Sequence, residues 1–241
     1  MLVLPEERQP IAELLQFLEQ GERLAYDCAT AQANLAPQPR MSRFLQGQAR
    51  QEAFHATLFH CATACIAPRH QRRNKYFPPL TEYRATINRA ISRKDFLETI
   101  LAEQVILECL GEATLHKLEL GLKKRDAPFQ GLRRLLLHQE AAHHVFGERV
   151  LEQAIGEGKT SYPALREKAT PYLALSEAII LSLQDRLKEI NENPQSYIDA
   201  HHQTLPSWLM DDPKGPCSIK DAIDSFPLSV DYDRMGHSIC V

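Results

Sequence analysis

Two Glu-x-x-His motifs, each inside a long segment with helical periodicity, constrain the fold of this chain most strongly. Glu52 and His55 form the first motif, and Glu140 and His143 form the second. Residues three apart on a helix share one face, so each motif can present a carboxylate and an imidazole to the same point. A carboxylate buried in this way needs a cation, a proton or a hydrogen-bond partner. The two helices are therefore expected to turn these faces toward each other.

Apolar residues recur at helical spacing along most of the first 191 residues, and no segment alternates as a β-strand would. Helices are predicted over residues 11–36, 41–66, 81–91, 94–124, 129–156 and 170–191. Pro37 ends the first helix, and Thr170 and Pro171 are predicted as the N-cap and first position of the last. Short connections near residues 38 and 126 predict antiparallel neighbours. The sequence thus predicts an all-α four-helix bundle with an additional helix.

The helix before each motif can supply one further carboxylate. The candidates are Glu13, Glu19 and Glu22 in the first helix, and Glu98, Glu103, Glu108 and Glu112 in the third. Glu22 precedes Glu52 by 30 residues and Glu108 precedes Glu140 by 32, so both choices place the partners at similar heights above the turn. Glu108 also lies in an apolar run, where an unpaired carboxylate would be costly. Glu22 and Glu108 are therefore the preferred candidates.

Three neighbouring residues remain as alternatives. Glu103 is the main rival to Glu108, and Glu112 lies one helical turn beyond it as a possible extra ligand or proton-handling group. His144 follows His143 but points about 100° away on a helix, which favours a role in packing or in support of the ligands.

One Glu from each of two helices and a Glu-x-x-His motif from each of the other two is the ligand pattern of ferritin-like carboxylate proteins. The predicted metal ligands, which are also the predicted catalytic residues, are Glu22, Glu52, His55, Glu108, Glu140 and His143. Six such oxygen and nitrogen donors suit two iron ions, with an iron–manganese pair less favoured. O₂ is the expected co-substrate.

Three segments resemble the metal-binding helices of ferritin-like non-haem di-iron oxygenases, and most nearly the cyanobacterial aldehyde-deformylating oxygenases. They are Phe17-Leu-Glu-Gln-Gly-Glu-Arg-Leu-Ala-Tyr-Asp27, Ile106-Leu-Glu-Cys109 and Glu140-Ala-Ala-His-His-Val-Phe-Gly-Glu-Arg-Val-Leu151. The resemblance covers about residues 11–155 and implies the same six ligands. A tyrosine common in that family two turns after the third-helix Glu is replaced here by Leu115.

Composition changes after about residue 205. Residues 206–241 contain four prolines and six acidic against three basic residues, so this segment carries the whole formal charge of −3. We expect a ferritin-like bundle domain over residues 1–205 and an extended, Pro-rich acidic tail over 206–241. The near balance of charge argues against a nucleic-acid-binding protein that works through an excess of basic residues. The N-terminus lacks a signal-peptide pattern, no apolar run could span a membrane, and the six cysteines are scattered, which together predict a cytoplasmic protein.

The function predicted is a di-iron oxygenase or oxidase acting on a small organic substrate, with an aliphatic one as a candidate. Phe54, Leu58 and Leu115 are expected to line its cavity. An external electron donor and a monomer or homodimer are expected. One alternative is a ferroxidase or iron-handling protein that uses the same ligands. Another is an enzyme similar to a tRNA hydroxylase, supported only by the basic loop at 67–75.

Overall fold

The computed structural model describes residues 3–68, 77–124 and 130–210, and within these ranges it contains helices and no strands. The long elements, in chain order, are α1 (Arg8–Leu35), α2 (Pro39–Ile66), α3 (Pro78–Ser92), α5 (Glu108–Lys124), α6 (Gln130–Gly156) and α7 (Tyr162–Ser182). The short elements are α4 (Phe96–Ile100), the π-helix η1 (Leu101–Leu107), α8 (Gln184–Glu189), α9 (Pro194–Thr204) and the 3₁₀ turn η2 (Ser207–Leu209). The predicted all-α architecture is confirmed.

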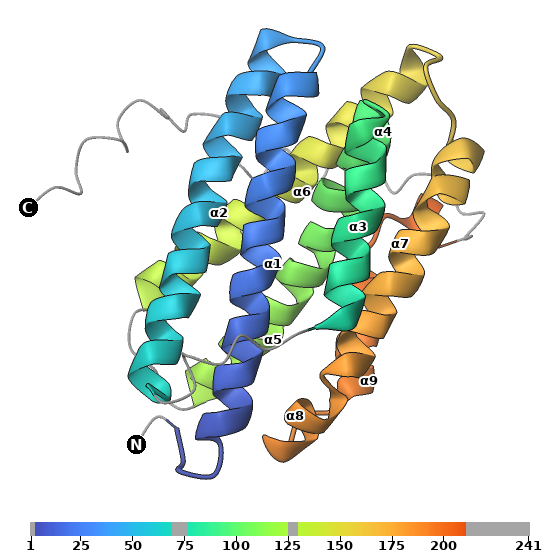
Figure 1. Cartoon of the computed structure of the whole chain (residues 1–241). Helices are drawn as coiled ribbons and strands as arrows, with labels where there is room; N and C mark the ends of the chain where they lie inside the picture. The colour runs from blue at the N-terminus through green and yellow to red at the C-terminus, as the bar shows by residue number, and fades with distance from the viewer. Residues whose placement is uncertain (1–2, 69–76, 125–129, 211–241) are drawn as a thin grey trace, which may run out of the picture. The chain divides into compact units, whose positions relative to one another are not determined.

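The chain divides into two units, Met1–Pro206 and Ser207–Val241, and the second is described only through η2 and the residue after it. In the first unit, α1 and α2 pack antiparallel along their length (Figure 1). The α5–α6 pair lies behind them, while α3 packs on α7 and α9 packs on α5. The apolar stripes of these helices bury Leu24, Leu45, Ile106 and Leu151 almost completely.

The third long helix, predicted over residues 94–124, runs without a gap from Phe96 to Lys124, but its middle part is π-helical rather than α-helical. Asp95 caps a short α4 by accepting a hydrogen bond from the Glu98 amide, and η1 then winds residues 101–107 as a π-helix before α5 begins. The Tyr83 hydroxyl donates to the Ala102 carbonyl and ties this segment to α3. Hydrophobic periodicity does not distinguish such a segment from an α-helix, although π-helical turns are frequent at functional sites.

The N-cap of the last long helix lies nine residues earlier than the predicted N-cap at Thr170. Ser161 is the N-cap of α7 and accepts a hydrogen bond from the Ala164 amide, so Pro171 lies inside the helix. A proline there removes the bond to the carbonyl four residues earlier. That carbonyl belongs to Glu167, which is exposed, so water can satisfy the group.

Gly147 allows α6 to approach the π-helix closely. A Cβ atom on Gly147 would lie 2.5 Å from the Cβ of Gln104 and 3.3 Å from its backbone carbon. We expect Gly147→Ala to lower the free energy of unfolding by about 1–3 kcal/mol, because the backbones must separate. Chemical denaturation measures this effect. Gly21→Ala, where a Cβ would meet nothing within 4 Å, is the matched control and should stabilise the chain; equal effects from both would contradict the argument.

His201 of α9 gives the fold an expected pH dependence. The side chain is fully buried, its Nε2 lies 3.0 Å from the Ser176 hydroxyl, and its Nδ1 has no hydrogen-bond partner. Burial, aided by the neighbouring His202, lowers the pKa of His201 from 6.5 to about 4. Between these pH values the unfolded chain binds a proton that the folded chain does not, so stability falls as pH decreases from 6.5 toward 4.

We therefore expect the wild type to lose about 2 kcal/mol more than His201→Gln between pH 7 and pH 5. Denaturant unfolding at the two pH values measures the difference. His116→Gln, which changes an exposed histidine, should keep the wild-type dependence. If His201→Gln also kept it, the charge state of His201 would not contribute.

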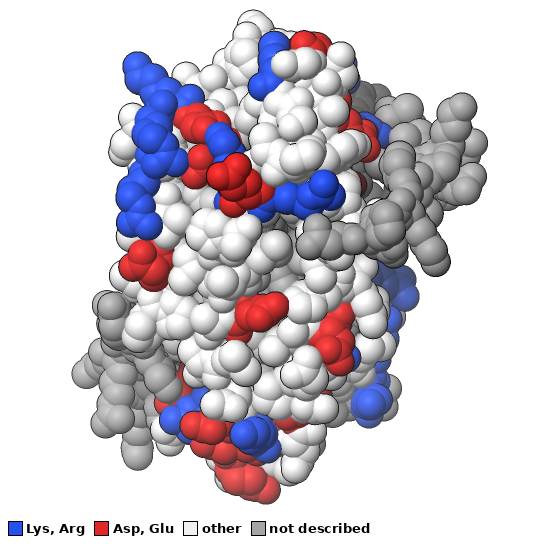
Figure 2. All heavy atoms as spheres, turned by 90° about the vertical axis from the view of Figure 1, so that its right-hand side faces the viewer, with Lys and Arg blue, Asp and Glu red and all other residues white. Residues whose placement is uncertain are grey.

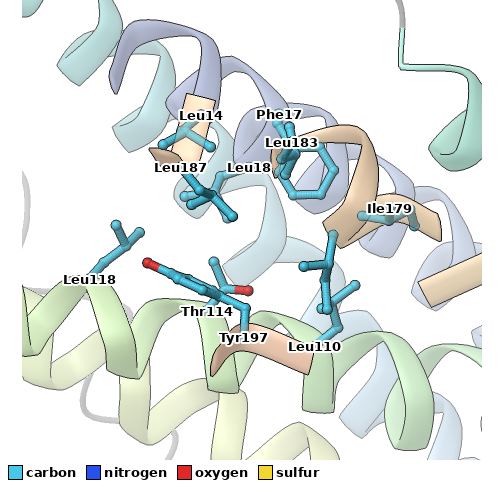
Figure 3. Close-up of a pocket in the computed structure, with 11 residues that line it drawn as sticks. Leu14, Phe17, Leu18, Leu110, Thr114, Leu118, Ile179, Leu183, Leu187 and Tyr197 are labelled. Atoms are coloured by element: carbon cyan, nitrogen blue, oxygen red, sulfur yellow. The ribbon is translucent and has the colours of Figure 1, made fainter. Parts of the chain in front are cut away.

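An apolar pocket lies between α1, α5 and the helices from α7 to α9 (Figure 3). Its volume is about 20 Å³, close to the space of one water molecule. It is lined by Leu14, Phe17, Leu18, Leu110, Thr114, Leu118, Ile179, Ile180, Leu183, Leu187 and Tyr197.

The residues expected to line a cavity, Phe54, Leu58 and Leu115, are not among those that line this pocket. Phe54 is 41% exposed, because it precedes the inward-facing His55 by one residue and so points to another side of α2.

Acidic and basic side chains lie beside one another on the face shown in Figure 2. Most of the basic loop predicted at 67–75 falls outside the described residues. Among the residues that are described, no helix is long and apolar enough to cross a membrane.

Candidate metal centre

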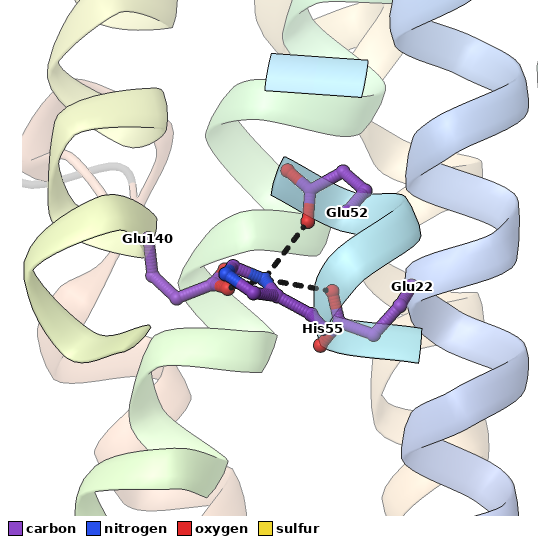
Figure 4. Close-up of side chains that lie close together, drawn as sticks. All are labelled: Glu22, Glu52, His55 and Glu140. Atoms are coloured by element: carbon purple, nitrogen blue, oxygen red, sulfur yellow. Dashed lines mark ion pairs between the residues drawn. The ribbon is translucent and has the colours of Figure 1, made fainter. Parts of the chain in front are cut away.

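The six predicted ligands converge inside the bundle from four helices. Glu22 comes from α1, Glu52 and His55 from α2, Glu108 from the first position of α5, and Glu140 and His143 from α6. Each is less than 10% exposed. Figure 4 shows Glu22, Glu52 and Glu140 around the imidazole of His55. The three-residue spacing of each motif thus places its carboxylate and imidazole on one buried face.

The donor atoms form two clusters that share Glu52. Glu22, Glu52, His55 and Glu140 each place a donor atom within 4.8 Å of the others, and Glu52, Glu108 and His143 do the same. In the first cluster, Nδ1 of His55 lies 3.1 Å from Glu140, 3.2 Å from Glu52 and 3.4 Å from Glu22.

In the second cluster, Nδ1 of His143 lies 2.9 Å from Oε1 of Glu52 and 3.5 Å from Oε1 of Glu108. Glu52 faces the first cluster with Oε2 and the second with Oε1. A carboxylate in this position can bridge two cations.

The other ring nitrogen of each histidine is held by a glutamine from the opposite motif. His55 Nε2 lies 2.8 Å from the Gln139 carbonyl oxygen, and His143 Nε2 lies 2.7 Å from that of Gln51. An amide oxygen only accepts, so each Nε2 carries the proton and each Nδ1 presents its lone pair to the cluster. This is the tautomer that a metal needs, held by the kind of outer contact that orients metal-binding histidines.

These two glutamines were missed in the sequence, although a signal was present. Residues 51–55 read Gln-Glu-Ala-Phe-His and residues 139–143 read Gln-Glu-Ala-Ala-His, so the repeat extends beyond Glu-x-x-His. In each repeat the first residue supports the histidine of the other one. The repeat therefore describes a pair of crossed interactions between α2 and α6.

Inside the two clusters, burial disfavours the charged form of each carboxylate, and the carboxylates also repel one another. Burial, followed by repulsion from Glu140, raises the pKa of both Glu22 and Glu108. Burial also acts to raise the pKa of Glu52, but His143 and His55 outweigh it and the net direction is downward. Burial acts to lower the pKa of His55, whereas contacts with Glu140, Glu22 and Glu52 raise it overall.

A divalent metal pair fits these residues. Both oxygens of Glu52, Oε1 of Glu140 and Nδ1 of both histidines are buried without a hydrogen-bond partner. Unsatisfied buried polar atoms are rare and need an explanation. Four carboxylates and two imidazoles are donors suited to iron or manganese. Two divalent ions would also balance the formal charge of the four carboxylates.

The alternative residues lie beside the clusters. Glu103 of η1 is fully buried near Glu108 but belongs to neither cluster. Glu112 lies 3.7 Å from Nδ1 of His144, and Nε2 of His144 lies 3.3 Å from the Cys109 thiol. His144 thus faces away from the clusters, as its position next to His143 on the helix requires.

Comparisons with known proteins place the fold. No family model matches the chain, and no curated protein sequence does. A solved structure that matches it, "Protein 19 with aldehyde deformylating oxidase activity from Synechococcus", has a TM-score of 0.70 and 16% sequence identity. The match covers 87% of this chain and 92% of the other. The chain therefore has a ferritin-like helical-bundle fold, similar to that of an aldehyde deformylating oxidase.

Proposed function

We propose that this chain is an oxidoreductase that holds two iron ions and uses O₂ to oxidise a small organic substrate. The observation that carries the proposal is the set of five buried, unpartnered donor atoms on Glu52, Glu140, His55 and His143. The similarity of fold to an aldehyde deformylating oxidase supports the same class of chemistry. Two iron ions bound here would supply an O₂-binding site and a pair of electrons for its reduction.

The six residues would hold the two ions in two groups. Glu22, Glu140 and His55 would hold one ion, Glu108 and His143 would hold the other, and Glu52 would contribute to both, since it belongs to both clusters. The glutamine contacts hold each imidazole with Nε2 toward the glutamine and Nδ1 toward the cluster, so little rotation of the rings is needed on metal binding. The six residues are each less than 10% exposed, so bulk water has little access to the centre.

The apolar pocket is the proposed place for the alkyl part of the substrate. Leu18 precedes Glu22 by one helical turn, and Leu110 follows Glu108 by two residues, so the pocket borders the helices that carry both ligands. The lining suits an aliphatic chain. At about 20 Å³ the pocket is too small for such a chain, so leucine and phenylalanine side chains must move on binding.

Iron loading and oxygen consumption test the proposal. The reduced apoprotein is titrated with Fe²⁺ without oxygen, the bound metal is counted, and O₂ is then admitted together with an aliphatic aldehyde and a chemical reductant. We expect about two iron ions per chain, fewer in Glu108→Ala and His143→Ala, and conversion of the organic compound. Oxidation of added Fe²⁺ in a many-subunit shell, without an organic product, would favour the ferroxidase alternative. One metal or none, unchanged by either substitution, would refute both.

A further inference from the structure

A fifth buried carboxylate, Glu103, lies next to the proposed centre. It is fully buried, and its Oε2 has no hydrogen-bond partner. The described residues include no Lys or Arg paired with Glu103, whereas Glu13, Glu98 and Glu119, also buried, pair with Arg186, Arg93 and Arg133. A buried carboxylate oxygen without a partner is costly, so Oε2 of Glu103 requires a partner that the described residues do not supply.

The π-helix explains why Glu103 and Glu108 occupy the same region. On an α-helix, residues five apart point about 140° away from each other. Here the Glu108 amide donates to the Glu103 carbonyl, which closes an i→i+5 turn and brings the two side chains toward one side. The irregular segment therefore adds a second carboxylate to the interior at the level of Glu108.

A glutamine from α2 holds the two carboxylates together. Nε2 of Gln48 donates to Oε1 of Glu103 at 3.0 Å and to Oε1 of Glu108 at 2.7 Å. The carbonyl oxygen of Gln48 accepts from Gln104 at 3.2 Å, which fixes the orientation of the amide. Gln48 thus leaves Oε2 of Glu103 as the free donor atom.

We propose that Glu103 is a seventh ligand and completes the site formed by Glu52, Glu108 and His143. That cluster has three residues, whereas the cluster around His55 has four, so the less complete site lies beside the unpaired carboxylate. The inference rests on the proposed function, because it requires the two-metal centre. With Glu103, each site has four residues, three carboxylates and one histidine, with Glu52 shared between them.

Metal titration of Glu103→Gln tests the inference without relying on turnover. Mn²⁺ is added to the full-length apoprotein, and the free ion is counted by electron paramagnetic resonance. We expect one of two sites to weaken by at least about tenfold, since even outer contacts change metal affinity by 10- to 100-fold. Glu98→Gln is the matched control: it neutralises a buried glutamate five residues earlier and should leave both affinities unchanged.

Glu103→Asp provides a second variant that keeps the charge but shortens the side chain. We expect the same site to weaken in this variant, because the donor atom no longer reaches the metal. Two sites of wild-type affinity in both variants would overturn the inference while leaving the proposed function intact. A wild-type protein that binds no metal would instead overturn the proposed function, and the seventh ligand with it.

Discussion

A Glu52→Gln variant is expected to bind neither metal ion tightly. Glu52 is the only residue that belongs to both clusters, and both of its oxygens are buried without a hydrogen-bond partner. The amide removes the bridging charge while keeping the shape of the side chain. Because losing an outer contact already weakens metal binding 10- to 100-fold, we expect a loss above about 100-fold at both sites. Isothermal titration calorimetry with Mn²⁺ or Fe²⁺ measures the affinity at the two sites.

Glu119→Gln is the control for Glu52→Gln. Glu119 is also buried, but its carboxylate pairs with Arg133 and lies outside both clusters. This variant should bind two metal ions as the wild type does. Tight binding of even one ion by Glu52→Gln would contradict a shared, bridging role.

The second large effect is expected from the crossed glutamines. Gln51→Leu removes the acceptor from His143, and Gln139→Leu removes it from His55. Each histidine can then rotate or change tautomer, so we expect affinity to fall about 10- to 100-fold at the site of the affected histidine. Gln51 is next to Glu52 in α2 but contacts His143 of α6, so its loss should weaken the site that contains His143 and Glu108 rather than the site that contains His55.

Two-site metal titration separates these outcomes. Gln51→Glu is the matched control, because it keeps an acceptor oxygen at the same position and should retain most of the affinity. If Gln51→Leu and Gln139→Leu both bound metal as the wild type does, the histidines would be oriented by packing alone.

The convergence of the six residues could be predicted from spacing. Residues three apart must share a helix face, and antiparallel helices joined by short turns place Glu22 opposite Glu52 and Glu108 opposite Glu140. The structure brings all six together within two clusters. Their role as metal ligands stays a prediction, which the titrations above address.

Three other features of the structure could not be predicted from the spacing of apolar residues. The π-helix preserves burial while changing which residues share a face, so periodicity alone could not place Glu103 beside Glu108. Pro171 predicts a helix start because proline favours first positions, but it lies inside α7, on the exposed side of the helix. Phe54 is apolar and next to His55, yet it points to solvent. Each case depends on tertiary contacts that a local pattern does not contain.

The crossed contacts also bear on how the bundle moves. α1 with α2 and α5 with α6 form two helical hairpins, and α2 meets α6 in few places. The Gln51–His143 and Gln139–His55 hydrogen bonds lie at this small contact between α2 and α6. A bound metal pair would link the two hairpins. Its removal would allow them to separate transiently, and amide hydrogen exchange along α2 and α6 would become faster. Metal dissociation and local opening between the two hairpins would then be thermodynamically coupled.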